Sequence, residues 1–237
     1  MTEGSGIFVR LERTERVMVI TLQRPERHNS LIPELLIQLI DALNGVRDDR
    51  SVQAVVLRAS GRSFSTGGDV RGFWEARDRI AAYADEIVGL LNESILAMMR
   101  LPQPILGAVH GPVTGGSLGL VLGCDIVLVS PEATFTPWYG PVGFAPDGGW
   151  TAILPEIIGQ ERVDDILADN RSITAAQAVA WGLATDMASV ETIWGESLLV
   201  AQRMADRAAG TAEHLKARTP EEVAAVSERL REERRRF

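Results

Sequence analysis

The sequence predicts a layered α/β domain, because a strand, a glycine-rich turn and a helix follow one another twice along the chain. In the first unit, the apolar stretch 52–57 precedes the turn Phe64-Ser65-Thr66-Gly67-Gly68-Asp69. In the second, the apolar stretch 104–109 precedes the glycine-rich turn 111–117. Strands that alternate with helices are typical of a sheet covered by helices. An amphipathic helix near the N-terminus fits the same plan.

Two strands and this helix are expected before the first unit. Residues 8–11 and 17–22 are apolar and β-branched, and the turn Arg24-Pro25-Glu26 ends the second stretch, so we expect an opening hairpin. Pro33 suits the first position of a helix. Apolar side chains then recur at spacings of three and four, which predicts a helix with one face on the sheet; they are Leu35, Leu36, Leu39, Ile40 and Leu43.

The remaining core elements should alternate in the same way. Helices are expected over 69–79 and 84–99, on either side of a short break in the pattern. A short helix over 118–123 should lead into a strand over 125–129. Segment 131–149 is the longest stretch rich in glycine, proline and aromatic residues, and such loops commonly line binding sites.

The C-terminal part of the chain is predicted to be helical. Thr174-Ala175-Ala176-Gln177 has the form of a capping box, and Gly182 should end the short helix that it starts. We expect a core domain over residues 1–190 and a helical oligomerisation region over 191–237. The densely charged tail 227–237 is interpreted as a solvated helix face.

Composition excludes several classes of protein. The 237 residues are 46% apolar and 24% charged, as in a soluble globular protein. No apolar run approaches the roughly 20 residues of a membrane span, and residues 1–6 lack the pattern of a secretory signal, so a cytoplasmic location is expected. The net charge of −8 argues against broad nucleic-acid binding.

Neither a disulfide nor a metal site is expected. Cys124 is the single cysteine, and its apolar neighbours suggest an inert core thiol. The histidines, at positions 28, 110 and 214, are too dispersed to suggest a metal site. Arginines gather around the first glycine turn and are each expected to be solvated at the surface; they are Arg24, Arg27, Arg62 and Arg71.

The two glycine-rich turns are the most informative feature for function. Each precedes a predicted helix, and the first N–H groups of a helix have no partner inside it. Glycine allows a ligand to approach the backbone closely. Together, the turns suit an oxyanion hole, in which N–H donors face an oxygen that gains negative charge.

A serine-hydrolase interpretation is weaker. Gly115-Gly116-Ser117-Leu118-Gly119 formally matches a nucleophile elbow, with Ser117 as nucleophile and His214 as its base. That motif requires a strand to run directly into its first glycine. Here, residues 111–114 intervene, so we do not expect an esterase.

Several segments of the sequence carry a resemblance to a known family: 22–31, 64–69, 107–112 with Gly115-Gly116, Cys124-Asp125-Ile126, Ala133-Thr134-Phe135, Pro146-Asp147-Gly148-Gly149, Leu154-Pro155 and Ile158-Gly159. In their order and spacing, these motifs resemble the crotonase family, also called the enoyl-CoA hydratase/isomerase superfamily, from about residue 7 to 190. The resemblance implies a spiral of ββα units, with a C-terminal helical region that builds trimers or hexamers. It also implies binding of acyl-CoA thioesters, with no cofactor beyond the coenzyme A of the substrate.

Carried over by position, the resemblance implies site residues. Backbone N–H groups of Gly68 and Gly116 would be the oxyanion donors, and Arg27 would lie near the coenzyme A phosphates. Backbone atoms around Phe64, Ser65 and Gly67 would hold its adenine end. Trp138 and Tyr139 would shape the acyl pocket, or serve packing alone.

The sequence departs from the family's hydratases at two positions. Those enzymes position water with two glutamates, where this chain has Gly119 and Tyr139. Glycine offers no carboxylate, and a phenol with a reference pKa of about 10 is a poor base at neutral pH. Hydration by the two-glutamate route is therefore not expected.

Asp147 remains as the candidate catalytic group. Its motif resembles that of family isomerases, in which this aspartate moves a proton between C2 and C4 of an enoyl thioester, and that of 4-chlorobenzoyl-CoA dehalogenases, in which it is a nucleophile. For proton transfer it must start ionised, and Phe144 and Trp150 are apolar neighbours that would raise its pKa. The structural alternative is that Asp147 caps a helix beginning near Gly149.

The sequence therefore predicts an enoyl-CoA isomerase with Asp147 as general acid and base. A non-catalytic acyl-CoA-binding scaffold is the main alternative, since both glutamates are missing and the C-terminal region is shorter than is usual in the family. Other enolate chemistries, including thioester hydrolysis, decarboxylation, carbon–carbon cleavage and residual hydration, are also left open.

Overall fold

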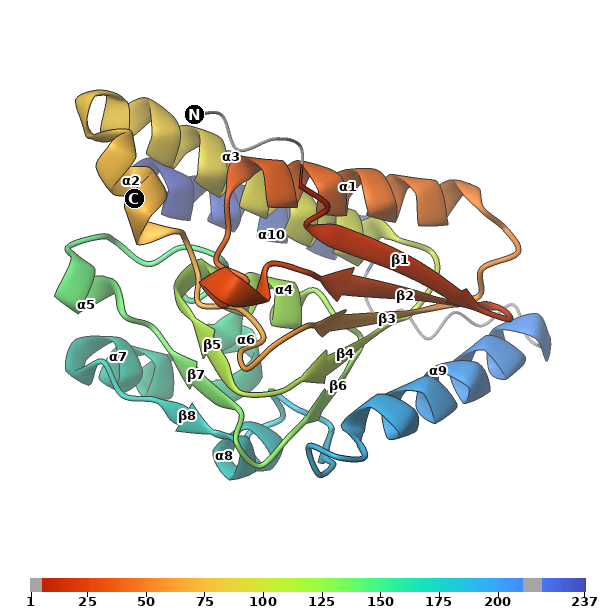
Figure 1. Ribbon diagram of the computed structural model, residues 1–237. Coiled ribbons are helices and arrows are strands. Elements are labelled where there is room, and N and C mark those ends of the chain that lie inside the picture. The colour runs from red at the N-terminus through yellow and green to blue at the C-terminus, as the bar shows by residue number, and fades with distance from the viewer. Residues whose placement is uncertain (1–5, 211–218) are drawn as a thin grey trace.

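The computed structural model describes residues 6–210 and 219–237 and has the predicted α/β architecture, with a six-stranded sheet at its centre (Figure 1). The opening hairpin is confirmed: β1 (Val9–Thr14) pairs antiparallel with β2 (Val17–Leu22). The next strands all pair in parallel. They are β3 (Ala54–Ala59), β4 (Ile105–Val109), β6 (Ile126–Val129) and β9 (Asp186–Met187).

Side-chain alternation along the central strands creates two apolar faces. In β2, Val17 and Val19 belong to one buried cluster, whereas Ile20 and Leu22 belong to the other. Figure 1 shows α1 (Pro33–Asp48) and α3 (Ile80–Arg100) along one face of the sheet. Helix α9 (Ile193–Gly210) lies along the opposite face. Apolar residues therefore bury both sides of the sheet, as parallel strands require.

A second, smaller sheet is missing from the sequence-based prediction. It contains β5 (Pro112–Thr114), β7 (Thr134–Thr136) and β8 (Ile173–Thr174). Segments 111–117 and 131–149 are thus not turn or loop throughout. Strands of two or three residues are too short to show a period of two in the sequence. This sheet carries the second glycine-rich turn away from the central sheet.

The shorter elements follow the predicted order. Thr174 and Gln177 form the expected capping box at the start of α8, and Gly182 follows the helix with a φ of +80°. The remaining α-helices are α2 (Val70–Glu75), α4 (Leu118–Leu122), α5 (Tyr139–Val142), α6 (Leu154–Ile158), α7 (Gln160–Asp169), α8 (Ala175–Ala180) and α10 (Pro220–Arg236). The 3₁₀ turns are Pro25–Arg27, Arg77–Arg79 and Gly115–Ser117.

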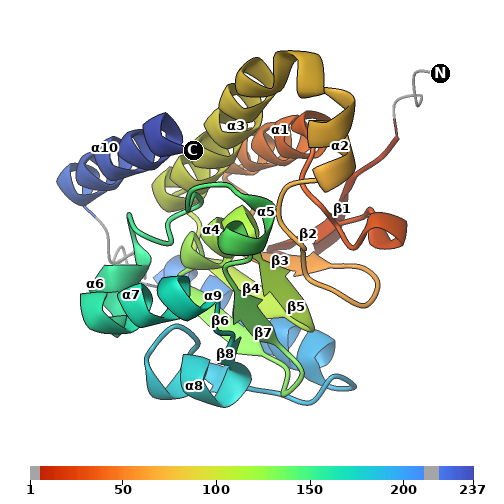
Figure 2. The ribbon, with the colours of Figure 1, turned by 90° about the vertical axis from the view of Figure 1, so that its left-hand side faces the viewer.

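The described C-terminal helices pack onto the core. Helix α10 returns across the molecule to lie beside α3 (Figure 2). Its inner face is buried, so the interpretation of the tail as a solvated helix face is wrong for this side; Ser227, Leu230 and Glu233 are at most 5% exposed. The proposed division at residue 190 and the role of this region in oligomerisation stay predictions. In the described residues, every helix is too short or too polar to cross a membrane.

A buried ion-pair network holds the first glycine turn in place. The Asp69 carboxylate accepts 2.8 Å hydrogen bonds from Arg24 and Arg27 and also caps α2 by accepting from the Arg71 backbone N–H. Arg24 is only 7% exposed, so the expectation that it is solvated is wrong. Although burial raises the pKa of Asp69, hydrogen bonds to the two arginines bring it below its ordinary value. Arg62 and Arg71 are exposed, as expected.

Replacing Asp69 tests this network. We expect Asp69→Ala to lower the free energy of unfolding by about 3 kcal/mol at pH 7, because Arg24 would stay buried without a counter-charge. The ion pairs stabilise the fold above the unfolded-state pKa of Asp69, and this contribution is lost as pH falls through the lower folded-state pKa. Urea unfolding at pH 7 and pH 3 measures both effects.

The matched control is Asp85→Ala, which removes an exposed ion pair with Arg234. This change should cost less than about 1 kcal/mol. Equal losses in the two variants would contradict a special role for the buried network.

Candidate active site

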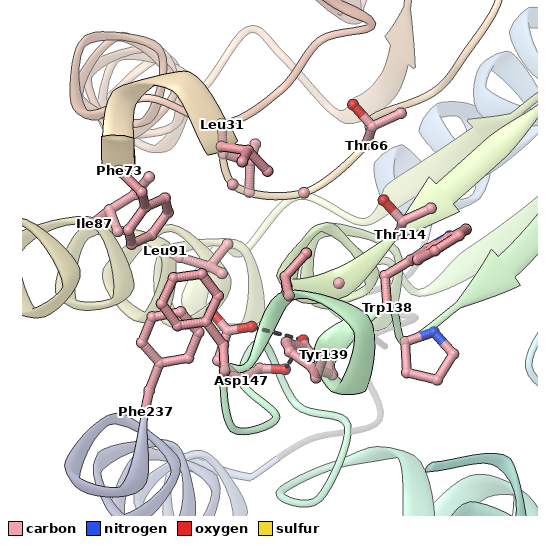
Figure 3. A pocket seen from close by; sticks show the side chains of 18 residues that line it. Leu31, Thr66, Phe73, Ile87, Leu91, Thr114, Trp138, Tyr139, Asp147 and Phe237 are labelled. Atoms are coloured by element: carbon pink, nitrogen blue, oxygen red, sulfur yellow. Dashed lines mark hydrogen bonds between the residues drawn. The ribbon is translucent and has the colours of Figure 1, made fainter. Parts of the chain in front are cut away.

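An apolar cleft with about 620 Å³ of empty space, part of it open to solvent, lies between the two glycine turns, α3 and α5 (Figure 3). Phe73, Ile87 and Leu91 form one wall, and Trp138 lies across from them. The cleft brings together most of the predicted site residues, namely Gly67, Gly68, Gly116, Trp138, Tyr139 and Asp147.

The two glycines that were expected to donate have free backbone N–H groups. Gly68 lies in an isolated bridge to Leu31 whose hydrogen bonds use Gly67 and Asp69 instead. Gly116 lies in the first turn of a 3₁₀ helix, where N–H groups have no internal partner. Within residues 6–210 and 219–237, neither N–H group has an acceptor. Both can therefore donate to a ligand oxygen in the cleft.

Asp147 lies directly against Gly116. A Cβ placed on Gly116 would stand 2.7 Å from Oδ1 and 2.8 Å from Oδ2 of Asp147. The next residue, Gly148, has a φ of +60°, and a Cβ there would lie 2.2 Å from the Gly116 carbonyl oxygen. Side chains at either position would separate the two segments. Glycine at both positions thus allows the Asp147 carboxyl group to lie beside the free N–H group of Gly116.

Tyr139 orients the Asp147 carboxyl group. Its hydroxyl donates to Oδ1 of Asp147 at 2.6 Å and also lies 3.0 Å from the Asp147 carbonyl oxygen (Figure 3). The idea that Asp147 caps a helix near Gly149 is wrong, because the next helix begins at Leu154. Trp138 is 49% exposed at the cleft mouth, with a φ of +60°.

The protein environment raises the pKa of Asp147 to a value near neutral pH. Burial raises its pKa from 3.8 to about 7, the negative charge of Glu233 adds to this, and the Tyr139 hydrogen bond acts in the opposite direction. Burial and the nearby Asp147 charge raise the pKa of Tyr139 well above 10. Tyr139 therefore stays protonated as a donor, while Asp147 can exchange a proton at physiological pH.

The position of Gly119 leaves no space for a carboxylate. A Cβ there would lie 2.3 Å from Ile95 and 2.8 Å from the Gly148 carbonyl oxygen. Backbone cannot move aside as a flexible side chain can. A glutamate at position 119 would therefore clash with the backbone at Gly148.

Sequence reasoning missed two residues that reach the site, Glu233 of α10 and Phe237, which follows the end of this helix. Phe237 lines the cleft and stacks on Phe144, with ring centroids 4.9 Å apart. Glu233 is buried and binds the backbone that follows Asp147. A signal for Glu233 was present, because it continues the apolar stripe of Val223, Val226 and Leu230 at helical spacing.

The structure does not place all expected coenzyme A contacts at the cleft. Phe64 and Ser65 are fully buried, and the Ser65 backbone is paired through Pro112 and Thr114. Gly67 lines the cleft with a φ of +73°. Arg27 is partly exposed and paired with Asp69.

The weaker chemical alternatives lose support. The Ser117 hydroxyl is buried and donates to the Ser65 and Thr114 carbonyl oxygens; His214, its suggested base, lies outside the described residues. The Cys124 thiol donates to the Leu120 carbonyl oxygen. No group of three or more potential metal ligands occurs in the described parts of the chain.

Two free N–H donors beside one carboxyl group, in an apolar cleft, form a site that can stabilise an oxyanion. The chain belongs to the enoyl-CoA hydratase/isomerase family, whose model matches residues 12–237. The resemblance to the crotonase superfamily is thereby confirmed, and acyl-CoA is the substrate class that the family implies.

Relatives within the family differ in chemistry. The chain is 32% identical to 4-chlorobenzoyl coenzyme A dehalogenase-2 of Arthrobacter sp over 184 residues, which cover 77% of this chain and 67% of that protein. It is 36% identical to the probable enoyl-CoA hydratase EchA12 of Mycobacterium tuberculosis over 206 residues, or 85% and 72% of the two chains. Family membership alone therefore does not select one reaction.

A solved structure confirms the crotonase fold. The enoyl-CoA hydratase of Bacillus halodurans superposes with a TM-score of 0.84 over 97% of this chain and 93% of that chain. At 22% identity, this likeness concerns the fold alone.

The raised pKa of Asp147 predicts a pH-dependent stability. The folded protein binds a proton at Asp147 that the unfolded chain has lost, in the window from pH 3.8 to about 7. Stability therefore falls as pH rises through this window. We expect Asp147→Asn to melt at a higher temperature than the parent at pH 8, by an amount that shrinks toward pH 4.

Thermal unfolding between pH 4 and pH 8 measures the difference. Asp164→Asn, on the exposed surface of α7, is the control and should track the parent. A difference between Asp147→Asn and the parent that does not depend on pH would contradict the raised pKa.

Proposed function

We propose that the protein is an enoyl-CoA isomerase that moves the double bond of an acyl-CoA thioester from C3 to C2, with Asp147 as general acid and base. The observation that carries the proposal is the contact between Asp147 and Gly116. In the described chain, Asp147 is the only acidic side chain that lines the cleft. A single group of this kind suits a reaction that removes one proton and returns it elsewhere.

The reaction begins when ionised Asp147 removes a proton from C2 of the 3-enoyl thioester. The C–H electron pair forms a C1–C2 double bond, and negative charge develops on the thioester oxygen. Gly68 and Gly116 donate their N–H groups to this oxygen, and such preorganised donors lower the barrier most effectively in an apolar cleft. No metal ion takes part in this route.

The second half returns the proton to C4. Electrons of the enolate shift to form the C2–C3 double bond, while the former C3–C4 bond becomes single as C4 takes the proton from Asp147. Tyr139 holds Oδ1 of the carboxyl group, which leaves Oδ2 to face the substrate. A pKa of about 7 suits both halves, because Asp147 must act as a base and then as an acid.

Two further expectations accompany this proposal. Coenzyme A would reach the cleft along the first glycine turn, with Gly67 and Arg27 as the remaining candidates for contact, and Trp138 at the mouth would border the acyl group. The family resemblance also leads us to propose a homotrimer or hexamer. A cytoplasmic location stays a prediction from composition.

The direct test is turnover of two substrates by purified protein. We expect trans-3-hexenoyl-CoA to convert to the 2-enoyl isomer without a change of mass, and Asp147→Asn to lower the rate at least 100-fold, the scale of general acid and base catalysis. Chromatography with mass detection follows the products. Circular dichroism confirms that the variant is folded.

Other results would select another function. Addition of one water to trans-2-hexenoyl-CoA would contradict the argument against hydration. Release of free coenzyme A would indicate hydrolysis. Binding without turnover, measured by calorimetry with both thioesters, would favour the non-catalytic scaffold.

The contact at Gly116 gives a second prediction. Gly116→Ala should lower kcat at least tenfold, because its methyl group would overlap the Asp147 carboxylate. Gly140→Ala is the matched control on neighbouring α5, where a Cβ would meet nothing within 4 Å. Steady-state kinetics measure kcat for both variants. Equal kcat values for Gly116→Ala and Gly140→Ala would contradict the proposed placement of Asp147.

A further inference from the structure

Glu233, near the end of α10, reaches the backbone that immediately follows Asp147. Its Oε2 accepts a 2.8 Å hydrogen bond from the Gly149 N–H. Its Oε1 accepts from the Thr151 N–H and hydroxyl at 2.7 Å each, and from the Ala152 N–H at 2.8 Å. A carboxylate 84 residues away in sequence thus organises the segment that carries Asp147.

Among the described residues, hydrogen-bond donors alone compensate the negative charge of the buried Glu233 carboxylate. Glu233 is 2% exposed, and it forms no ion pair within residues 6–210 and 219–237. Two arginines of α10 bind other groups: Arg229 binds Glu156 and the Ala152 carbonyl oxygen, and Arg234 binds Asp85. Burial raises the pKa of Glu233 above its ordinary value, whereas the hydrogen bonds from Gly149, Thr151 and Ala152 act in the opposite direction and favour the ionised carboxylate.

We propose that Glu233 is a positioning residue for Asp147: it anchors the Gly149–Ala152 backbone, and its negative charge disfavours a second negative charge on Asp147. This inference rests on the proposed function, in which Asp147 must hold and release a proton. A neutral glutamine offers one acceptor oxygen where the Glu233 carboxylate offers two, and Glu233 uses both of its oxygens to accept from the backbone.

The groups that face Asp147 are few. Tyr139 on α5 donates to it, Glu233 on α10 repels its charge, and the α3 wall presents apolar Ile87 and Leu91. The direction follows: Tyr139 lowers the proton affinity of Asp147, whereas Glu233 raises it. Removal of the Glu233 charge should lower the pKa of Asp147.

Tyr139 provides a readout that needs no turnover. The chain has two tyrosines, Tyr83 and Tyr139. With [¹³Cζ]tyrosine, the protein gives two signals, and Tyr139→Phe assigns them. Because the Tyr139 hydroxyl binds Asp147, its ¹³Cζ shift should titrate with Asp147, at about pH 7 in the parent, and this titration should vanish in Asp147→Asn.

In Glu233→Gln we expect the midpoint of this titration to fall by roughly one pH unit, because the repelling charge is gone. Thr151→Val is the matched control: it removes one hydrogen bond to Glu233 and keeps the charge, so its midpoint should stay at the parent value. Glu233→Asp retains the charge but retracts it, and its midpoint should fall by less. This variant decides the question if Glu233→Gln does not fold.

An unchanged midpoint in folded Glu233→Gln, or in Glu233→Asp when only that variant folds, would overturn the proposal and leave a structural cap. The acidic limb of the kcat/KM profile with trans-3-hexenoyl-CoA should move with the NMR midpoint. A parent protein that titrates at Tyr139 but does not turn over this substrate would refute the proposed function and leave the positioning role intact.

Discussion

The close contact between Gly116 and the Asp147–Gly148 backbone is the constraint on which the site depends. Neither side of this contact tolerates a Cβ, since one at Gly148 would lie 2.2 Å from the Gly116 carbonyl oxygen. It joins the small sheet, which carries the second glycine turn, to the loop before α6. A carboxyl group and a free N–H donor are thereby held side by side without a side chain between them.

The two buried aspartates of the site, Asp69 and Asp147, differ in how the protein compensates their negative charge. At the first turn, Asp69 is paired with Arg24 and Arg27, so its buried charge is compensated. At Asp147, the neighbours are one hydroxyl donor and a second carboxylate, so the proton is held more tightly. The fold thus accepts a loss of stability at the residue that is proposed to react, as functional sites often do.

Much of the main architecture could be predicted because it repeats clear patterns. The opening hairpin, the helix after Pro33 and the glycines of both turns follow from local periodicity and turn chemistry. The strands β5, β7 and β8 could not, since two or three residues carry no period. Arg24 and Glu233 were misjudged because their burial depends on partners distant in sequence. Coenzyme A contact at Phe64 and Ser65 stays a prediction from the resemblance, and both residues are buried.

The central claim is that one carboxyl group carries the proton from C2 to C4. It is tested most directly with trans-3-hexenoyl-CoA deuterated at C2, with the position of the label determined by NMR and mass in the earliest product formed. The account predicts that part of the trans-2-hexenoyl-CoA carries deuterium at C4, because Asp147 returns the atom that it removed. If the earliest product carried only solvent hydrogen at C4, this result would contradict the account, because the proton at C4 would then come from another group.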